Sequence, residues 1–114
     1  GKISEPERLQ NLRCVWRVVA EARQRRTDID WTVMLNEVMA VYVAGGFTRH
    51  AVDMLQQYAL FGAQPDQQTY RQLLEMLGRD LQDVGRFFSL WEAVPRDPQP
   101  PADLYNLALE MALE

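Results

Sequence analysis

Few side chains in this 114-residue chain are suited to catalysis or metal binding. The only histidine, His50, follows Arg49 and has no cysteine or pair of acids at metal-ligand spacing, so we expect a solvated or capping side chain rather than a ligand. Asp80 and Asp83 are expected to be charges at the N-terminus of a helix. No nucleophile elbow, phosphate-binding glycine loop or HExxH motif is present. The sequence therefore predicts a chain that is not an enzyme. We expect it to have no catalytic residue, metal ligand, cofactor or small-molecule substrate.

The lone cysteine, Cys14, cannot form an internal disulfide. It stands among Leu12, Val15 and Trp16, and no basic side chain is arranged to favour a thiolate. We expect a packed core thiol.

Charge restricts the kind of partner. The net charge is −4, whereas nucleic-acid-binding domains usually carry a basic surplus. Residues 1–47 hold seven Lys or Arg against six Asp or Glu, and residues 48–114 hold five against ten, so a polyanion would prefer the N-terminal part. We expect solvent-facing side chains at Arg13, Arg17 and three further arginines near residue 25. Positive charges at the end of the helix interact favourably with the helix dipole. The alternative is contact with phosphate or with an acidic partner.

The remaining composition is that of a globular chain, with 47% hydrophobic residues. No run approaches the ~20 uninterrupted apolar residues of a membrane span, and residues 1–4 do not begin a signal peptide. We expect a soluble segment without a membrane span.

Helix signals dominate, and no segment alternates polar and apolar residues as a strand does. A capping box at residues 4–7 begins a helix that should run to about Arg25. Glycines and prolines divide the rest into five more helices. We expect these at residues 31–44, 48–61, 67–77 and 80–94, and from about 101 to the last residue. The breaks should fall near residues 45–46, 62–65, 78–80 and 95–101.

An internal repeat relates these helices. A shift of 35 residues places residues 64–78 on residues 99–113 with six identities in fifteen positions, where ordinary composition gives about one. A shift of 33 relates the apolar positions of the helices at 48–61 and 80–94. The core positions expected from this register are Ala51, Leu55, Val84 and Phe88.

The repeat predicts an all-α fold, a solenoid of helical hairpins with a period of about 35 residues. Residues 1–30 would be the second helix of a preceding unit and a linker. Residues 31–66 and 67–101 would each be a hairpin, the later one with a proline-rich linker, and residues 102–114 the first helix of a further unit. Because that last helix has an apolar face without a partner, we expect a piece of a longer protein or a contact with another subunit.

The arrangement resembles the pentatricopeptide repeat family. In that family the first helix typically begins Thr-Tyr, the second carries a small residue followed four later by an apolar one, and the unit closes with Gly-x-x-Pro-Asp. The matching residues are Thr69-Tyr70, Ala51 with Leu55, and Gly62 to Asp66. The resemblance covers about residues 31–114.

The match is that of a divergent member, with Leu35 in place of the first tyrosine and Pro101 in place of an aspartate. A tetratricopeptide repeat is an alternative, but its Trp-x-x-Leu-Gly-x-x-Tyr motif is absent. A generic helical bundle is another, but it would not explain the identities at a 35-residue shift.

Membership would imply binding of single-stranded RNA, one nucleotide per repeat, read by the residue after the helix tyrosine and by the last residue of the unit. These positions hold Asn36 and Asp66, then Arg71 and Pro101, then Asn106. The first pair resembles the family's uridine-preferring combination, because an amide can donate and accept and a carboxylate can orient it. The alternative is a solvated Asn36 and an N-capping Asp66. Arg71 with Pro101 offers no comparable geometry.

Two functions remain open. The resemblance implies an RNA-binding protein of mitochondria or chloroplasts that acts in RNA processing, editing, stability or translation. The alternative is a scaffold that contacts protein subunits of a mitochondrial ribosome or another ribonucleoprotein assembly. The acidic C-terminal half favours the scaffold, and the Asn36–Asp66 pair favours RNA.

Overall fold

The computed structural model describes residues 5–26 and 28–114, with side chains from residue 7 onward. These ranges form six helices and no strand, counting α3 with α4 as one interrupted helix and η1 as the end of α5. The elements are α1 (Glu5–Arg25), α2 (Trp31–Ala44), α3 (Thr48–Asp53), α4 (Leu55–Leu60), α5 (Gln67–Glu75), η1 (Met76–Asp80), α6 (Val84–Trp91) and α7 (Ala102–Ala112). The predicted all-α class is confirmed. No helix of the described ranges has both the length and the apolar character that crossing a membrane requires.

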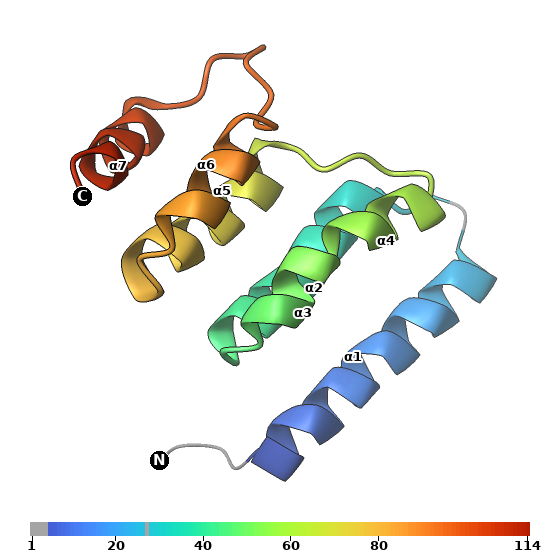
Figure 1. Ribbon diagram of the computed structural model, residues 1–114. Coiled ribbons are helices and arrows are strands. Elements are labelled where there is room, and N and C mark those ends of the chain that lie inside the picture. Colours follow the sequence, from blue (N-terminus) through green and yellow to red (C-terminus); the bar gives the residue numbers. More distant parts are fainter. Residues whose placement is uncertain (1–4, 27) are drawn as a thin grey trace.

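Successive helices pack side by side in a flat arrangement (Figure 1). α1 lies along the hairpin that α2 makes with α3 and α4, α5 lies beside α2, and α6 packs between α5 and α7. The Cα atoms span 46 × 37 × 20 Å, so the molecule is about two helix layers thick. Its core runs through both layers. The largest fully buried side chains are Tyr58, Phe87, Leu35, Met39, Leu73, Leu74, Leu77, Leu104 and Thr69.

Local signals explain where most helices begin and end. α2, α5 and α7 start at Trp31, Gln67 and Ala102, which are 36 and 35 residues apart. Asp30 and Asp66 cap the first two by accepting backbone N–H groups at 3.2 and 3.1 Å. The turns after α2 and α4 use glycines 46 and 62, whose φ angles of 78° and 68° are ones that L side chains rarely adopt.

The helix predicted at residues 48–61 is interrupted at Met54. The backbone N–H of Met54 is shared between the carbonyls of His50 (3.0 Å) and Ala51 (3.2 Å), and its carbonyl accepts from Gln57 N at 2.9 Å. These three-residue spacings tighten the chain for one turn and separate α3 from α4.

Gly78 does not end the helix that contains it, contrary to the prediction. The chain continues through Gly78 as η1, a π-helical turn, to Asp80. The helix reversal follows at Gln82, which has a φ of 52°. Gly78 is buried, and a Cβ there would lie 3.2 Å from Leu107 and 3.3 Å from Phe87. This glycine therefore permits close packing of η1 against α6 and α7.

The start of α6 also differs from the prediction. The helix expected to start at residue 80 starts later, because Asp83 is its N-cap and accepts from Arg86 N at 3.1 Å. α6 is shorter than predicted at both ends, because it begins at Val84 and ends at Trp91.

The expected core register is right at Ala51, which is fully buried, but Val84 in the first turn of α6 is 38% exposed. Leu55 and Phe88 are partly buried, and Phe87 is the fully buried side chain of α6.

The prediction for Cys14 is wrong. Among the α1 side chains from Glu7 onward, Leu12 and Val19 are buried, whereas Cys14 is exposed. Two positions beyond Leu12 on a helix of 3.6 residues per turn, Cys14 falls on the opposite face.

Candidate nucleic-acid interface

The N-terminal halves of α2 and α5 bring Asn36 and Asp66 together. Asn36 lies in the second turn of α2, and Asp66 is the N-cap of the neighbouring α5. Asn36 Nδ2 donates to Asp66 Oδ1 at 3.0 Å. The Asn36 backbone carbonyl accepts from Gln72 Nε2 at 3.0 Å, a second contact between the two helices.

Asn36 is only 9% exposed, so its amide must find partners inside the protein. Its Oδ1 accepts from the hydroxyl of Tyr58 on α4 at 2.7 Å and from Thr69 Oγ1 on α5 at 2.5 Å. Both of these residues are fully buried. The alternative prediction, in which Asn36 is a solvated helix residue, is therefore wrong for Asn36. Asp66 is exposed and does act as an N-cap, in a capping box with Thr69.

Burial raises the pKa of Tyr58 to about 12. The neighbouring Thr69 hydroxyl lowers the pKa of Tyr58, and the charge of Asp66 raises it, but both effects are smaller than that of burial. The hydroxyl consequently stays protonated and available as a donor throughout the neutral range.

Sequence reasoning missed Tyr58 and Thr69 as members of this cluster. Tyr58 falls on the apolar stripe of its helix, and Thr69 enters the argument only through the Thr-Tyr pair of the family. The usable signal was chemical, because a buried tyrosine hydroxyl needs a hydrogen-bonding partner. Its identity depends on how α4, α2 and α5 pack, which the sequence pattern does not give.

Arg71 is not joined to this cluster. Its guanidinium binds Asp103 of α7 through two hydrogen bonds, of 2.6 and 3.1 Å, and Glu75 through one of 3.3 Å. The hydrogen bond between Arg71 and Asp103 raises the pKa of Arg71 and lowers the pKa of Asp103. Arg71 thus connects α5 to α7. Its predicted partner position, Pro101, supplies no polar side chain, and Asn106 is exposed on α7.

An open cleft of about 510 Å³ adjoins Asp66 where the loops before α2, α5 and α7 meet. Its lining residues are Asp30, Thr32, Gln64, Pro65, Asp66, Gln67, Gln68, Pro95, Asp97 and Pro98. Three of these are aspartates and none is basic, so the cleft disfavours a phosphate group.

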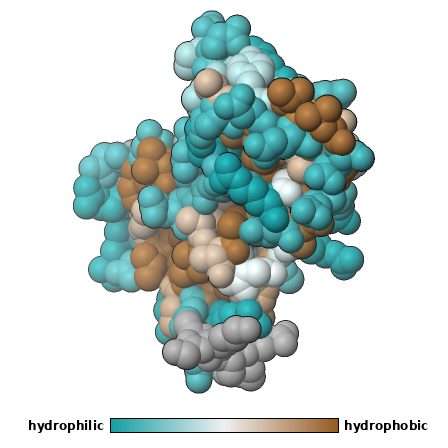
Figure 2. All heavy atoms as spheres, turned by 90° about the vertical axis from the view of Figure 1, so that its left-hand side faces the viewer, coloured by the Kyte–Doolittle hydropathy of each residue, from teal (hydrophilic) through white to brown (hydrophobic). Residues whose placement is uncertain are grey.

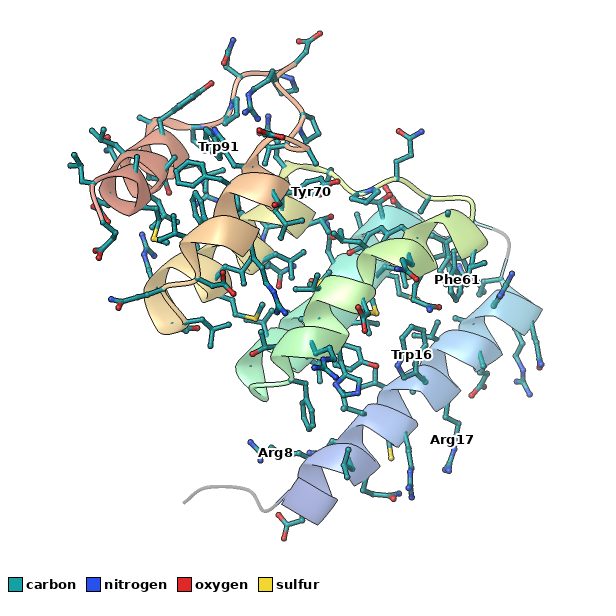
Figure 3. The ribbon with its side chains drawn as sticks, in the orientation of Figure 1. Arg8, Trp16, Arg17, Phe61, Tyr70 and Trp91 are labelled. Atoms are coloured by element: carbon teal, nitrogen blue, oxygen red, sulfur yellow. The ribbon has the colours of Figure 1, made fainter. Side chains whose placement is uncertain are left out.

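Two arginines of α1 hold the helix layers together. Arg8 donates to the Gly45 carbonyl at 2.9 Å, and Arg23 donates to the Leu60 carbonyl at 3.2 Å and lies 4.5 Å from the centre of the Phe61 ring. Arg17, by contrast, is exposed and points away from the hairpin (Figure 3).

The remaining chemical candidate, His50, is exposed near the start of α3 and stacks on Tyr42, with ring centres 6.0 Å apart. Within residues 5–26 and 28–114, no three His, Cys, Asp or Glu side chains are grouped so that they could hold a metal ion.

Comparison of the chain with protein-family models, with curated proteins and with solved structures finds no match.

Proposed function

We propose that this chain is a non-catalytic segment of a helical-hairpin repeat protein, resembling pentatricopeptide repeats, that binds single-stranded RNA. The observation that carries the proposal is the 3.0 Å contact between Asn36 and Asp66, which are thirty residues apart in the sequence. The resemblance makes these two positions the ones that read a base together, and their proximity is what joint reading requires.

The regular starts of α2, α5 and α7 support a repeat architecture, as does the packing of α2 against α5. The burial pattern agrees in part. Met54 and Phe87, which are equivalent under the 33-residue shift, are both buried, and Leu55 and Phe88 are both partly buried. Each hairpin would then present the N-terminal half of its first helix along one edge.

The hydrogen-bonding capacity of the pair limits what it can read. Because both acceptor positions of Asn36 Oδ1 are used internally, the amide can offer a ligand only its second Nδ2 hydrogen. Asp66 adds the acceptor Oδ2. One donor beside one acceptor suits the edge of a uracil, and the acidic cleft next to the pair leaves phosphate contacts to other surfaces.

The resemblance also supplies the cellular setting of this proposal. We place the segment in mitochondria, with chloroplasts as the other organelle that the family implies, in a ribonucleoprotein assembly that processes, edits, stabilises or translates RNA.

The proposal is tested by titrating the ¹⁵N-labelled chain with hexauridine at one fixed salt concentration and following the binding by NMR. Loss of a base contact is worth about 1–3 kcal/mol, so Asn36→Ala and Asp66→Asn should each weaken binding by roughly five- to a hundredfold. Asn11→Ala, an exposed asparagine of α1, should bind as the wild type does.

Asn36→Ala leaves two buried hydroxyls without their acceptor, so its helicity is checked first by circular dichroism. Asp66→Asn keeps an N-cap and serves as the variant that preserves the fold. Equal binding by the wild type and by both folded variants would show that this pair does not read RNA.

A protein-interaction scaffold is the second candidate, and the surface of α7 favours it. Tyr105, Leu109 and Leu113 are exposed apolar residues spaced four apart, and Leu109 is 60% exposed. Viewed from the α7 side, hydrophobic patches interrupt the polar surface (Figure 2). A folded wild-type chain that binds no RNA in the hexauridine titration would favour this function.

A further inference from the structure

The Asn36 amide is held in one of its two orientations. Its oxygen lies on the inner side, against the hydroxyls of Tyr58 (2.7 Å) and Thr69 (2.5 Å), and its nitrogen lies toward the exposed Asp66 (3.0 Å). Rotating the amide by half a turn would place Oδ1 against the Asp66 carboxylate, so that two acceptors would face each other.

The hydroxyl of Thr69 contributes to this preference because it is itself oriented. Its oxygen accepts the backbone N–H of Asp66 at 3.0 Å. Its hydrogen has two acceptors within reach, Asn36 Oδ1 at 2.5 Å and Asp66 Oδ1 at 3.2 Å, and the nearer Asn36 Oδ1 is the stronger partner. The Tyr58 hydroxyl approaches from a different helix, α4, and is fully buried. Two donors from two elements therefore fix the amide before any ligand arrives.

We infer that Tyr58 and Thr69 are positioning residues that present Asn36 to a ligand only as a hydrogen-bond donor. The inference rests on the proposed RNA-binding function and deepens it. A fixed donor accepts a base that offers an acceptor in that place and rejects one that offers a donor. At the pyrimidine 4-position uracil carries the acceptor O4, whereas cytosine carries a donor amino group. Tyr58 and Thr69 thus determine the preference for uracil without touching the base.

Removing the Tyr58 hydroxyl relaxes this control. In Tyr58→Phe the amide keeps only one of its two internal donors, so the flipped orientation, with Oδ1 available to the cytosine amino group, becomes more accessible. Discrimination between the two pyrimidines should therefore fall, largely through better binding of cytosine. A loss of packing alone would weaken both ligands equally.

The test is a titration of the ¹⁵N-labelled chain with hexauridine and with hexacytidine, followed by NMR because one base contact gives only weak binding. We expect the wild type to prefer hexauridine by about five- to tenfold and Tyr58→Phe to prefer it by less than about twofold. The Asn36 side-chain NH₂ signals should also shift in Tyr58→Phe without RNA.

Tyr42→Phe is the matched control, because it removes another buried tyrosine hydroxyl, one that accepts from Trp16 Nε1 at 2.7 Å and does not contact Asn36. It should keep the wild-type preference. Thr69→Val is a second variant with the same expectation as Tyr58→Phe, and Thr69→Ser should restore the preference.

The outcomes separate the two claims. A wild-type chain that binds neither oligonucleotide overturns the proposed function. A uridine preference that Tyr58→Phe and Thr69→Val both retain in full overturns the positioning role and leaves RNA binding in place.

Discussion

At the scale of single residues, the cluster around Asn36 shows how a polar group is accommodated in an almost fully buried position. Each internal hydrogen bond of the amide comes from or goes to a different residue: Tyr58, Thr69 and Asp66. Because a buried polar group without a partner costs about 1–3 kcal/mol, the cluster tolerates little change. The same contacts that stabilise the fold thereby restrict what Asn36 can offer a ligand.

The buried Tyr58 hydroxyl predicts a dependence of stability on alkaline pH. Its pKa is about 12 in the folded chain and is near 10 in an unfolded one. Between these values the unfolded chain has released a proton that the folded chain keeps, so the free energy of unfolding falls as pH rises. We expect Tyr58 to contribute a loss of about 1–3 kcal/mol between pH 10 and 12.

Urea denaturation of the wild type and of Tyr58→Phe across this pH range measures the contribution. The variant should start less stable and should lose less stability on the way to pH 12. Parallel curves for the two proteins would show that Tyr58 titrates as an ordinary tyrosine.

At the scale of elements, Gly78 and Gly85 are expected to respond oppositely to the same substitution. A Cβ at Gly78 meets Leu107 at 3.2 Å and Phe87 at 3.3 Å, whereas the nearest atom to a Cβ at Gly85 is the Asp83 carboxylate at 3.9 Å. Gly78→Ala should therefore destabilise the chain by about 1–3 kcal/mol through overpacking. Gly85→Ala, on the exposed face of α6, should stabilise it by roughly 0.5–1 kcal/mol.

Both values come from chemical denaturation of the two variants beside the wild type. A stabilising Gly78→Ala would mean that η1 does not pack closely against α6 and α7, and that this glycine serves only the backbone.

The register of α6 gives a second prediction at this scale. Phe87 is fully buried and Phe88 only partly so. Phe87→Ala should cost about 3–5 kcal/mol, because it removes transfer free energy and leaves a cavity, and Phe88→Ala should cost clearly less. Thermal unfolding of the two variants compares them directly, and a larger loss in Phe88→Ala would restore the register expected from the 33-residue shift.

Sequence reasoning located the helices where local chemistry decides them. The aspartate caps of α2 and α5 and the left-handed glycines at 46 and 62 act on neighbouring residues, so their effect is visible in the sequence. Gly78 was misinterpreted because its role depends on Leu107, which lies in another helix. Asn36 and Asp66 were singled out by resemblance, but Tyr58 and Thr69 became visible only when three helices were placed together.

At the scale of the whole molecule, the charge distribution and the candidate site favour different partners. The cleft beside Asp66 is lined by three aspartates, and α7 carries exposed apolar residues. Binding of RNA here would therefore depend on base contacts more than on neutralised phosphates, and its affinity should fall only gently with salt. A scaffold would instead bind its protein partner through α7, and the surface where α2 and α5 meet would stay free of that partner.

The backbone amide NMR spectrum of the ¹⁵N-labelled chain, recorded during a titration with hexauridine, distinguishes these two surfaces most directly. If the chain binds single-stranded RNA through the Asn36–Asp66 pair, shift changes should concentrate around Asn36, Asp66 and the first turn of α5, and should saturate as the oligonucleotide is added. Signals of α1 and of the exposed face of α7 should stay in place. A spectrum that does not change at saturating hexauridine would contradict the proposed RNA-binding function, and one that changes only along α7 would contradict binding through the Asn36–Asp66 pair.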